Sequence, residues 1–137
     1  PGTDVVVAKT PFGNIGLMVC YDLRFPELAL TLRARGANIL TAPAAFTYTT
    51  GQMHWQLLLQ ARAMDSQSIV LGAAQQGWHG EKRQTWGHAA ATNSRGQVLD
   101  LILNPGAQLI TVPFDLAEQV QIRESMPLMQ HRKLVQF

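Results

Sequence analysis

The sequence predicts a layered α/β fold, and three observations support this prediction. Short runs of β-branched and apolar residues, typical of strands, recur along the chain. Segments with apolar residues three and four positions apart, typical of helices with one buried face, lie between the first of these runs. In the last third, strand-like segments follow one another with turns between them. Such an order of elements is typical of packed layers. We expect residues 1–137 to form a single domain.

The first third is predicted to contain two strands and a helix. Residues 5–8 are rich in valine and predict the first strand. Residues 15–19 form an uninterrupted apolar run, which predicts a strand buried on both faces. From residue 25 to about residue 35 the period becomes helical, with Pro26 in the first turn and Gly36 directly after the end.

The middle third is predicted to hold a strand, a loop, a helix and another strand. Residues 38–42 are a short apolar strand, and residues 44–51 are a small and polar loop. Residues 53 to about 65 give the clearest helical pattern, and residues 68–74 are a buried strand. The apolar positions expected on one face of that helix are Leu57, Leu58, Ala61 and Met64.

The last third is predicted to be a strand meander followed by a helix. Residues 88–92, 97–103 and 109–112 have strand-like patterns and are separated by turn residues. Asp115 is predicted to cap a helix that runs to about residue 123, with Glu118 in the position of a capping box. The tail over residues 126–137 has no clear period.

Composition excludes several classes of protein. The net charge is +2, and the sequence has no long basic stripe of the kind that binds nucleic acid. The sequence has no run of about 18 apolar residues, so we expect no membrane span. The single cysteine allows no internal disulfide and favours a reducing compartment, so we expect a cytoplasmic protein. No metal-ligand spacing or phosphate-binding glycine loop is visible, so we expect no metal and no cofactor. The chain begins without Met, and we expect an N-terminal part to be missing.

Cys20 is the residue most indicative of chemistry, because it ends an apolar strand a few residues before a helix. A nucleophile on such a turn is held rigidly, and the next backbone N–H, that of Tyr21, can face a developing oxyanion. Two alternatives remain open on pattern alone. Cys20 could be a small apolar core residue, or it could act with a histidine base. The histidines available for that role are His54, His79, His88 and His131.

Residues 20–27 read Cys-Tyr-Asp-Leu-Arg-Phe-Pro-Glu and closely resemble the nucleophile motif of the nitrilase superfamily of carbon–nitrogen hydrolases. The resemblance spans nearly the whole chain and is closest to the Nit branch. It continues through residues 43–46, 50–51, 54–55, 58–63, 73–75, 86–88 and 126–127, and the segments 80–83 and 130–132 point to the Nit branch. It implies an α-β-β-α sandwich, of which this chain is the C-terminal portion.

The resemblance also implies a reaction. Members of this superfamily hydrolyse linear amides through a thioester on a Cys nucleophile, with a Glu base and a Lys that lie upstream of the nucleophile, outside this chain. The implied substrate is the primary amide of a deaminated glutathione-like ω-amide, which gives an acid and ammonia. The alternatives are an ω-amidase, an N-carbamoyl amide hydrolase, or, in another class, a catalytically incomplete fragment that acts only by association. No cofactor is implied.

Four residues are candidates for substrate binding. Arg24 could grip a substrate carboxylate with its planar guanidinium, or it could form a structural pair with Asp22 or Glu27. Ala45 and Phe46 could line the pocket if their strand runs parallel to that of Cys20; the alternative is an ordinary packed loop. His54 opens a helix, where a histidine is more often structural than catalytic.

A homodimer is also expected. The helices over residues 25–35 and 53–65 carry more apolar positions than one buried stripe requires. In the family this pair of helices forms a two-fold interface that the C-terminal tail crosses.

Overall fold

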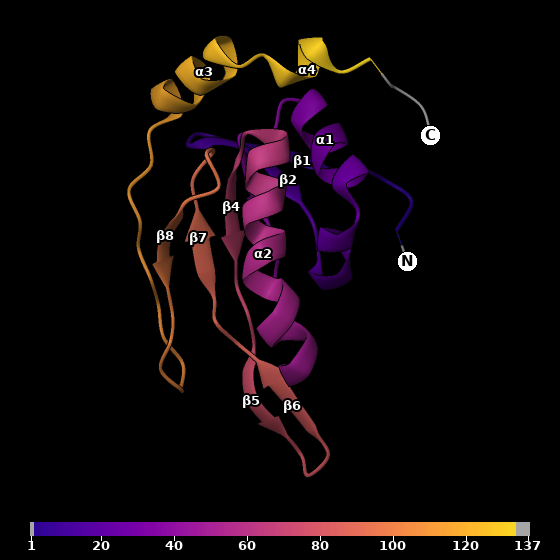
Figure 1. The fold of residues 1–137 in the computed structure, drawn as a ribbon, viewed down its shortest axis with the longest axis vertical. Coiled ribbons are helices and arrows are strands. Elements are labelled where there is room, and N and C mark those ends of the chain that lie inside the picture. The colour runs from indigo at the N-terminus through magenta and orange to yellow at the C-terminus, as the bar shows by residue number, and fades with distance from the viewer. Residues whose placement is uncertain (1, 134–137) are drawn as a thin grey trace.

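A six-stranded sheet forms the centre of the computed structural model, which describes residues 2–133 (Figure 1). Its strand order is β1-β2-β3-β4-β7-β8. The central strands β2, β3 and β4 are parallel, whereas β1, β7 and β8 are each antiparallel to their neighbours. The six strands are β1 (Val7–Thr10), β2 (Gly13–Leu17), β3 (Ile39–Thr41), β4 (Ile69–Gly72), β7 (Ala90–Thr92) and β8 (Val98–Leu101). The predicted layered α/β fold is confirmed.

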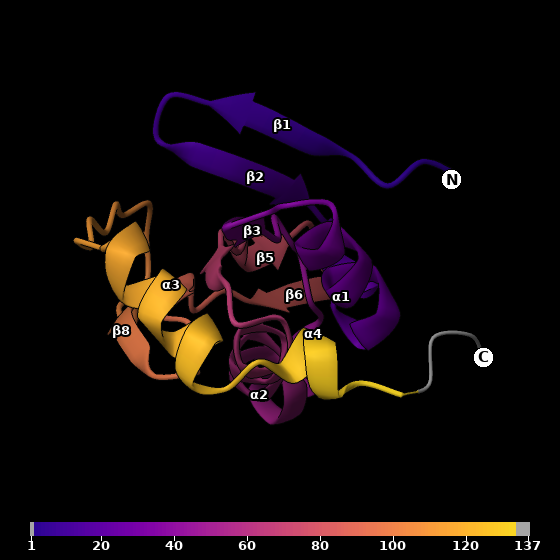
Figure 2. The same cartoon turned by 90° about the horizontal axis from the view of Figure 1, so that it is seen from above.

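Two helices, α1 (Pro26–Ala34) and α2 (Tyr48–Ser66), cover one face of this sheet (Figures 1 and 2). The hydrophobic core lies between them and the strands. Its fully buried members include Ala29, Leu32, Leu40, Trp55, Leu59, Ala63 and Val70. Trp55 also donates its Nε1–H to the carbonyl of His88 at 2.6 Å, because a buried indole N–H needs an acceptor. No helix within residues 2–133 is long and apolar enough to cross a membrane.

Helix α2 begins earlier than the sequence predicts and buries a different face. It starts at Tyr48, inside the segment expected to be a loop. Its sheet-facing side carries Trp55, Leu59 and Ala63. By contrast, Leu57 is 65% exposed and Met64 is 51% exposed, although both were expected on the apolar face of the helix. Two apolar stripes run along this helix, and the sequence does not show which of them meets the sheet.

Other predicted elements also need correction. Strand β2 is only partly buried, since Leu17 is 47% exposed on the side away from the helices. Residues 109–112 are not a strand, and Leu109 is 90% exposed. An unpredicted hairpin, β5 (Gln76–His79) and β6 (Arg83–Trp86), extends beyond the sheet (Figure 1).

The aromatic residues of this hairpin have different environments. Trp78 is exposed, whereas Trp86 stacks on His88 at a ring-centroid distance of 3.9 Å and contacts Tyr48 edge-on. Of these two tryptophans, only Trp86 is therefore packed against neighbouring aromatic rings.

The C-terminal helices lie at the amino ends of the parallel strands. Asp115 accepts a bond from the Ala117 N–H at 2.7 Å and caps α3 (Leu116–Ser125), as predicted. Arg123 on α3 donates to the carbonyls of Gln67 and Ala37. Burial, together with the charge of nearby Arg33, lowers the pKa of Arg123 to about 10. A short helix, α4 (Leu128–His131), follows; residues 134–137 of the predicted tail lie outside the described residues.

Candidate active site

The carboxyl ends of β2, β3 and β4 meet at one edge of the sheet and carry the candidate site. The chain leaves β2 through Cys20, β3 through Pro43 and β4 through Ala73. Backbone bonds continue between these extensions. The Cys20 N–H donates to the Pro43 carbonyl at 2.9 Å, and the Ala44 N–H donates to the Ala73 carbonyl at 2.8 Å. This is the edge of a parallel sheet at which ligands gather.

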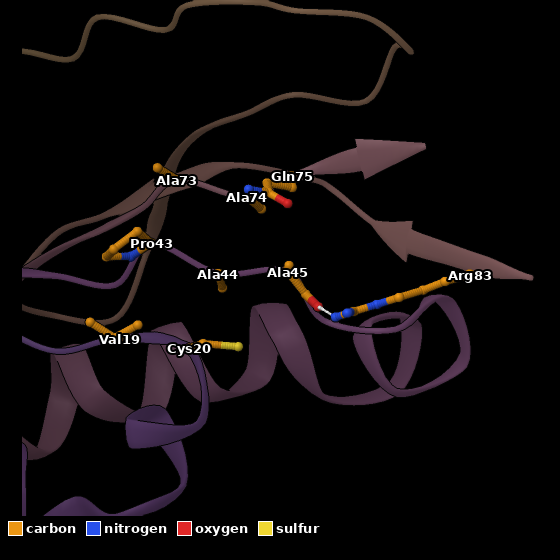
Figure 3. Close-up of a pocket in the computed structure, with 9 residues that line it drawn as sticks. All are labelled: Val19, Cys20, Pro43, Ala44, Ala45, Ala73, Ala74, Gln75 and Arg83. Carbon is orange, nitrogen blue, oxygen red and sulfur yellow. Dashed lines mark hydrogen bonds between the residues drawn. The ribbon is translucent and has the colours of Figure 1, made fainter. Parts of the chain in front are cut away.

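A cleft of about 560 Å³ opens between these extensions and the β5–β6 hairpin. We call it the Arg83 lobe. It is lined by Val19, Cys20, Pro43, Ala44, Ala45, Ala73, Ala74, Gln75 and Arg83. Figure 3 shows the Cys20 thiol near Ala44 and the Arg83 side chain running from its strand toward Ala45, and all four residues line the same cleft.

Cys20 opens a short 3-10 helix, η1 (Cys20–Arg24), in an uncommon backbone conformation. Its φ is +49°, in the left-handed region that non-glycine residues rarely adopt. Asp22 fixes the turn by accepting a bond from the Val19 N–H at 2.8 Å. The thiol is half-buried rather than enclosed in the core, so the purely structural reading of Cys20 is not favoured.

The backbone N–H groups beside the thiol differ in availability. The Cys20 N–H is already bonded to Pro43. The Tyr21 N–H has no acceptor within residues 2–133. An unpartnered N–H next to a nucleophile is the geometry that an oxyanion-stabilising donor requires.

A second cleft of about 390 Å³ adjoins the first and shares Cys20 and Ala45 with it. We call it the Arg24 lobe. Its other lining residues are Tyr21, Arg24, Phe46, Thr47 and Thr50. Five of the six residues predicted for the site therefore lie around this lobe. The sixth, His54, lies behind Arg24 and bonds to it through Nδ1 at 3.2 Å from Arg24 Nη2.

Arg24 forms none of the structural pairs that the sequence left open. Within residues 2–133 the recorded ion pairs are Arg62–Asp65 and Arg95–Glu118. The Arg24 guanidinium instead contacts the Tyr21 and Phe46 rings, 5.4 and 5.9 Å from their centroids. Because a guanidinium has only donors, Arg24 Nη2 donates this bond and Nδ1 of His54 accepts it. The other N–H groups of the Arg24 guanidinium stay available to a ligand.

A cysteine–histidine pair is not supported by the geometry. No histidine and no carboxylate among the described residues lines either lobe. His79 bonds Thr85, and His88 bonds the Trp86 carbonyl. Within the same residues, no group of three or more metal-ligating side chains could hold a metal ion. The part of the site formed by these residues therefore supplies a thiol, a backbone donor and two guanidinium groups.

Sequence reasoning missed several lining side chains, among them Thr50 and Arg83. Thr50 lies in the first turn of α2, which was predicted to be loop. Arg83 belongs to the basic pair Lys82–Arg83, which is visible in the sequence but has no pattern linking it to Cys20.

Comparison with known proteins decides the family. Residues 1–124 match the carbon-nitrogen hydrolase family. The chain belongs to this family. It is 46% identical over 136 residues to a deaminated glutathione amidase of Yersinia enterocolitica, covering 98% of this chain and 47% of the relative. The predicted resemblance to the Nit branch is confirmed.

Solved structures agree with this placement. Nit3 of Saccharomyces cerevisiae, a member of branch 10 of the nitrilase superfamily, has a TM-score of 0.88 at 30% identity, over 98% of this chain and 49% of that one. An amidase from Nesterenkonia sp. AN1 has a TM-score of 0.68 at 28% identity, over 74% of this chain and 38% of that one. A mutant of that amidase carries the acetamide moiety of fluoroacetamide on its active-site cysteine. This chain spans about half the length of the Yersinia relative.

Proposed function

We propose that the full-length protein hydrolyses the C–N bond of a linear amide with Cys20 as the nucleophile. The observation that carries this proposal is the position of Cys20. Its half-buried thiol faces a cleft at the carboxyl ends of three parallel strands, beside the unpartnered N–H of Tyr21. The covalent adduct on the active-site cysteine of the Nesterenkonia amidase supports the same role.

The proposed reaction has two halves. The Cys20 thiolate attacks the amide carbonyl, and the resulting oxyanion accepts a hydrogen bond from the Tyr21 N–H. The C–N bond then breaks, the nitrogen takes from the general base the proton that the thiol gave up and leaves as an amine or ammonia, and the acyl group stays on sulfur as a thioester. Water attacks the thioester carbonyl, which releases the carboxylic acid and restores the thiol.

A base and an oxyanion-stabilising cation complete this mechanism. No carboxylate within residues 2–133 lines the lobes around Cys20. We propose that a Glu and a Lys from another part of the full-length protein fill these roles, as the resemblance to the nitrilase superfamily implies. Residues 1–137 would then belong to a single catalytic domain of that protein.

The substrate proposed is an ω-amide that carries a carboxylate on its acyl half. The Arg24 guanidinium lines the lobe next to Cys20 and has N–H groups available for bidentate binding. The relatives named deaminated glutathione amidase support a deaminated glutathione-like ω-amide. An ω-amidase and an N-carbamoyl amide hydrolase are the alternatives. The lone, half-buried thiol also supports the expected reducing, cytoplasmic setting.

The experiment compares the full-length protein with its Cys20→Ala variant. Product release from deaminated glutathione, α-ketoglutaramate and a carbamoyl amino acid identifies the substrate class. Cys20→Ala should lower turnover by at least about 10³-fold, because loss of a covalent nucleophile removes the main reaction route. Unchanged melting of the variant controls for folding, and retained amidase activity would refute the nucleophile assignment.

The alternative from another class is a catalytically incomplete form that acts only by association. A thiol-reactive amide probe separates the two functions. An intact site is labelled at Cys20, whereas a site that lacks its base is not.

A further inference from the structure

Asp22 is bonded back to the residue that precedes Cys20. Its Oδ2 accepts the Val19 N–H at 2.8 Å, and its own backbone N–H donates to the Val19 carbonyl at 3.0 Å. Within residues 2–133 the side chain forms no other hydrogen bond and no ion pair. The proposed function uses the Cys20 thiol and the Tyr21 N–H, and it gives Asp22 no part in the reaction.

These two bonds enclose the Cys20–Tyr21 peptide, whose N–H is the unpartnered donor beside the thiol. On the preceding side, the Cys20 N–H is held by the Pro43 carbonyl at 2.9 Å. An oxyanion donor is most effective when its direction is fixed before the reaction, because no free energy is then spent on reorienting it. The direction of the Tyr21 N–H therefore depends on the bonds on both sides of it.

The backbone of Cys20 does not favour this arrangement by itself. Its φ of +49° lies in the left-handed region, which is unfavourable for a residue with a side chain. A carboxylate that accepts a backbone N–H at the start of a helix stabilises the turn by an amount comparable with that cost. Without the acceptor on Asp22, we expect the Cys20–Tyr21 peptide to leave its observed conformation for much of the time.

We infer that Asp22 is a positioning residue for the reaction, which holds the Tyr21 N–H in the direction that an oxyanion beside Cys20 requires. The inference rests on the proposed function. Both halves of that reaction pass through an oxyanion, first when sulfur attacks the amide and then when water attacks the thioester. A negative charge does not help a thiol to lose its proton, so the useful property of this side chain is its acceptor oxygen. Asp22 is needed for turnover but not for the reactivity of the thiol.

The test separates turnover from thiol reactivity in the full-length protein. Turnover is measured with the amide, of the three named for the proposed function, that the protein hydrolyses fastest. Thiol reactivity is measured with iodoacetamide, in which sulfur displaces iodide from a saturated carbon and no oxyanion forms. Asp22→Ala and Asp22→Asn lose the same charge, but only asparagine keeps an acceptor oxygen in the same place. Asp115→Ala is the matched control, because Asp115 also accepts a backbone N–H, that of Ala117 at 2.7 Å, and lines neither lobe.

Asp22→Ala should lower kcat roughly tenfold with little change in KM, the effect of one lost bond to a charged acceptor. Asp22→Asn should recover most of this loss, both variants should react with iodoacetamide at the same rate, and Asp115→Ala should match the unaltered protein in both assays. Alkylation that falls in step with turnover in Asp22→Ala would show that the turn holds the thiol and not the oxyanion donor. An undiminished kcat in Asp22→Ala, or an Asp22→Asn protein as slow as Asp22→Ala, would also overturn the inference.

A second pair of variants serves if Asp22→Ala does not fold. Asp22→Glu keeps the charge but moves the acceptor by one methylene group, so turnover should be faster in Asp22→Asn than in Asp22→Glu, and the reverse order would overturn the inference. Cys20→Ala tests the proposed function separately. If that variant retains amidase activity, or if the unaltered protein hydrolyses no amide, the proposed function fails and the inference falls with it.

Discussion

At the scale of single residues, Cys20 combines an uncommon backbone with a fixed side-chain direction. A left-handed conformation costs a non-glycine residue about 1–2 kcal/mol, yet Cys20 adopts it at φ +49°. The bonds of its N–H to Pro43 and of Asp22 to Val19 hold the turn in place. The conformation turns the chain from the extension of β2 into η1, and the thiol lies in the cleft (Figure 3).

Arg24→Lys tests the acyl-side anchor. The change keeps the positive charge but loses the planar fork that can bind a carboxylate through two parallel bonds. Catalysis on acid-bearing amides should fall roughly tenfold, the effect of one lost charge-assisted bond, whereas neutral amides should be little affected. Steady-state kinetics on a matched pair of amides measures the difference. Equal losses, together with a lower Tm, would instead indicate a structural role through His54.

The site residues that could be predicted lie in two short segments, the nucleophile motif and the loop that follows β3. Cys20, Tyr21 and Arg24 fall within one motif and one turn, so a local pattern is enough to find them. Arg83 lines the same cleft as Cys20 only because the β5–β6 hairpin folds back beside the extension of β3, where Thr47 also pairs with Thr85. That contact depends on long-range packing, which short-range periodicity does not encode.

At the scale of elements, α2 shows why helix position is easier to predict than helix orientation. Its period identifies a helix, but Trp55, Leu59 and Ala63 form one apolar stripe and Met53, Leu57 and Met64 form another. The choice between them is made by the sheet. Gly72 on β4 leaves space for Trp55 and Leu59, since a methyl group there would lie 2.7 Å from the Trp55 ring.

Gly51→Ala tests the contact between α2 and the β5–β6 hairpin. A methyl group at Gly51 would lie 2.2 Å from Cβ of Trp86. Alanine favours a helix by about 1 kcal/mol over glycine, but overpacking costs about 1–3 kcal/mol and sometimes more. We expect the clash to dominate because both partners are tied to backbone, and the free energy of unfolding of the full-length protein to fall by about 2 kcal/mol.

Gln52→Ala is the control for this experiment, because Gln52 is exposed on the same turn of α2. Denaturant unfolding of both variants gives the two changes in stability. A more stable Gly51→Ala protein would show that helix propensity, and not close packing against Trp86, governs this position.

At the scale of the whole molecule, the helices cover one face of the sheet and leave the other face, which is apolar, uncovered. Thr41, Leu71, Ala91 and Ile102 line a groove of about 460 Å³ there, together with Leu109 of the irregular segment that follows β8. Apolar sheet faces are normally covered by another layer. In the α-β-β-α sandwich implied by the resemblance to the nitrilase superfamily, a second sheet would fill this position.

The second exposed surface is the stripe of Met53, Leu57 and Met64 on the outer side of α2. These side chains are 59%, 65% and 51% exposed. Their spacing in the sequence, about one and two helical turns, places them on one face of α2. A helix with two apolar stripes buries the second against another surface. Helix α1 packs beside α2, so both predicted interface helices border the same side of the molecule (Figure 2).

We therefore predict that the full-length protein is a homodimer built on this side. In a two-fold contact each residue occurs twice, so a single charge introduces two unfavourable groups. Leu57→Glu should convert the dimer to a monomer in sedimentation velocity at micromolar concentration. Activity should fall as well, because α2 also carries Thr50 of the Arg24 lobe and His54 that bonds Arg24. Gln52→Glu adds the same charge to an exposed position off the stripe and should leave both properties unchanged. An unaltered protein that sediments as a monomer with full activity would contradict the prediction.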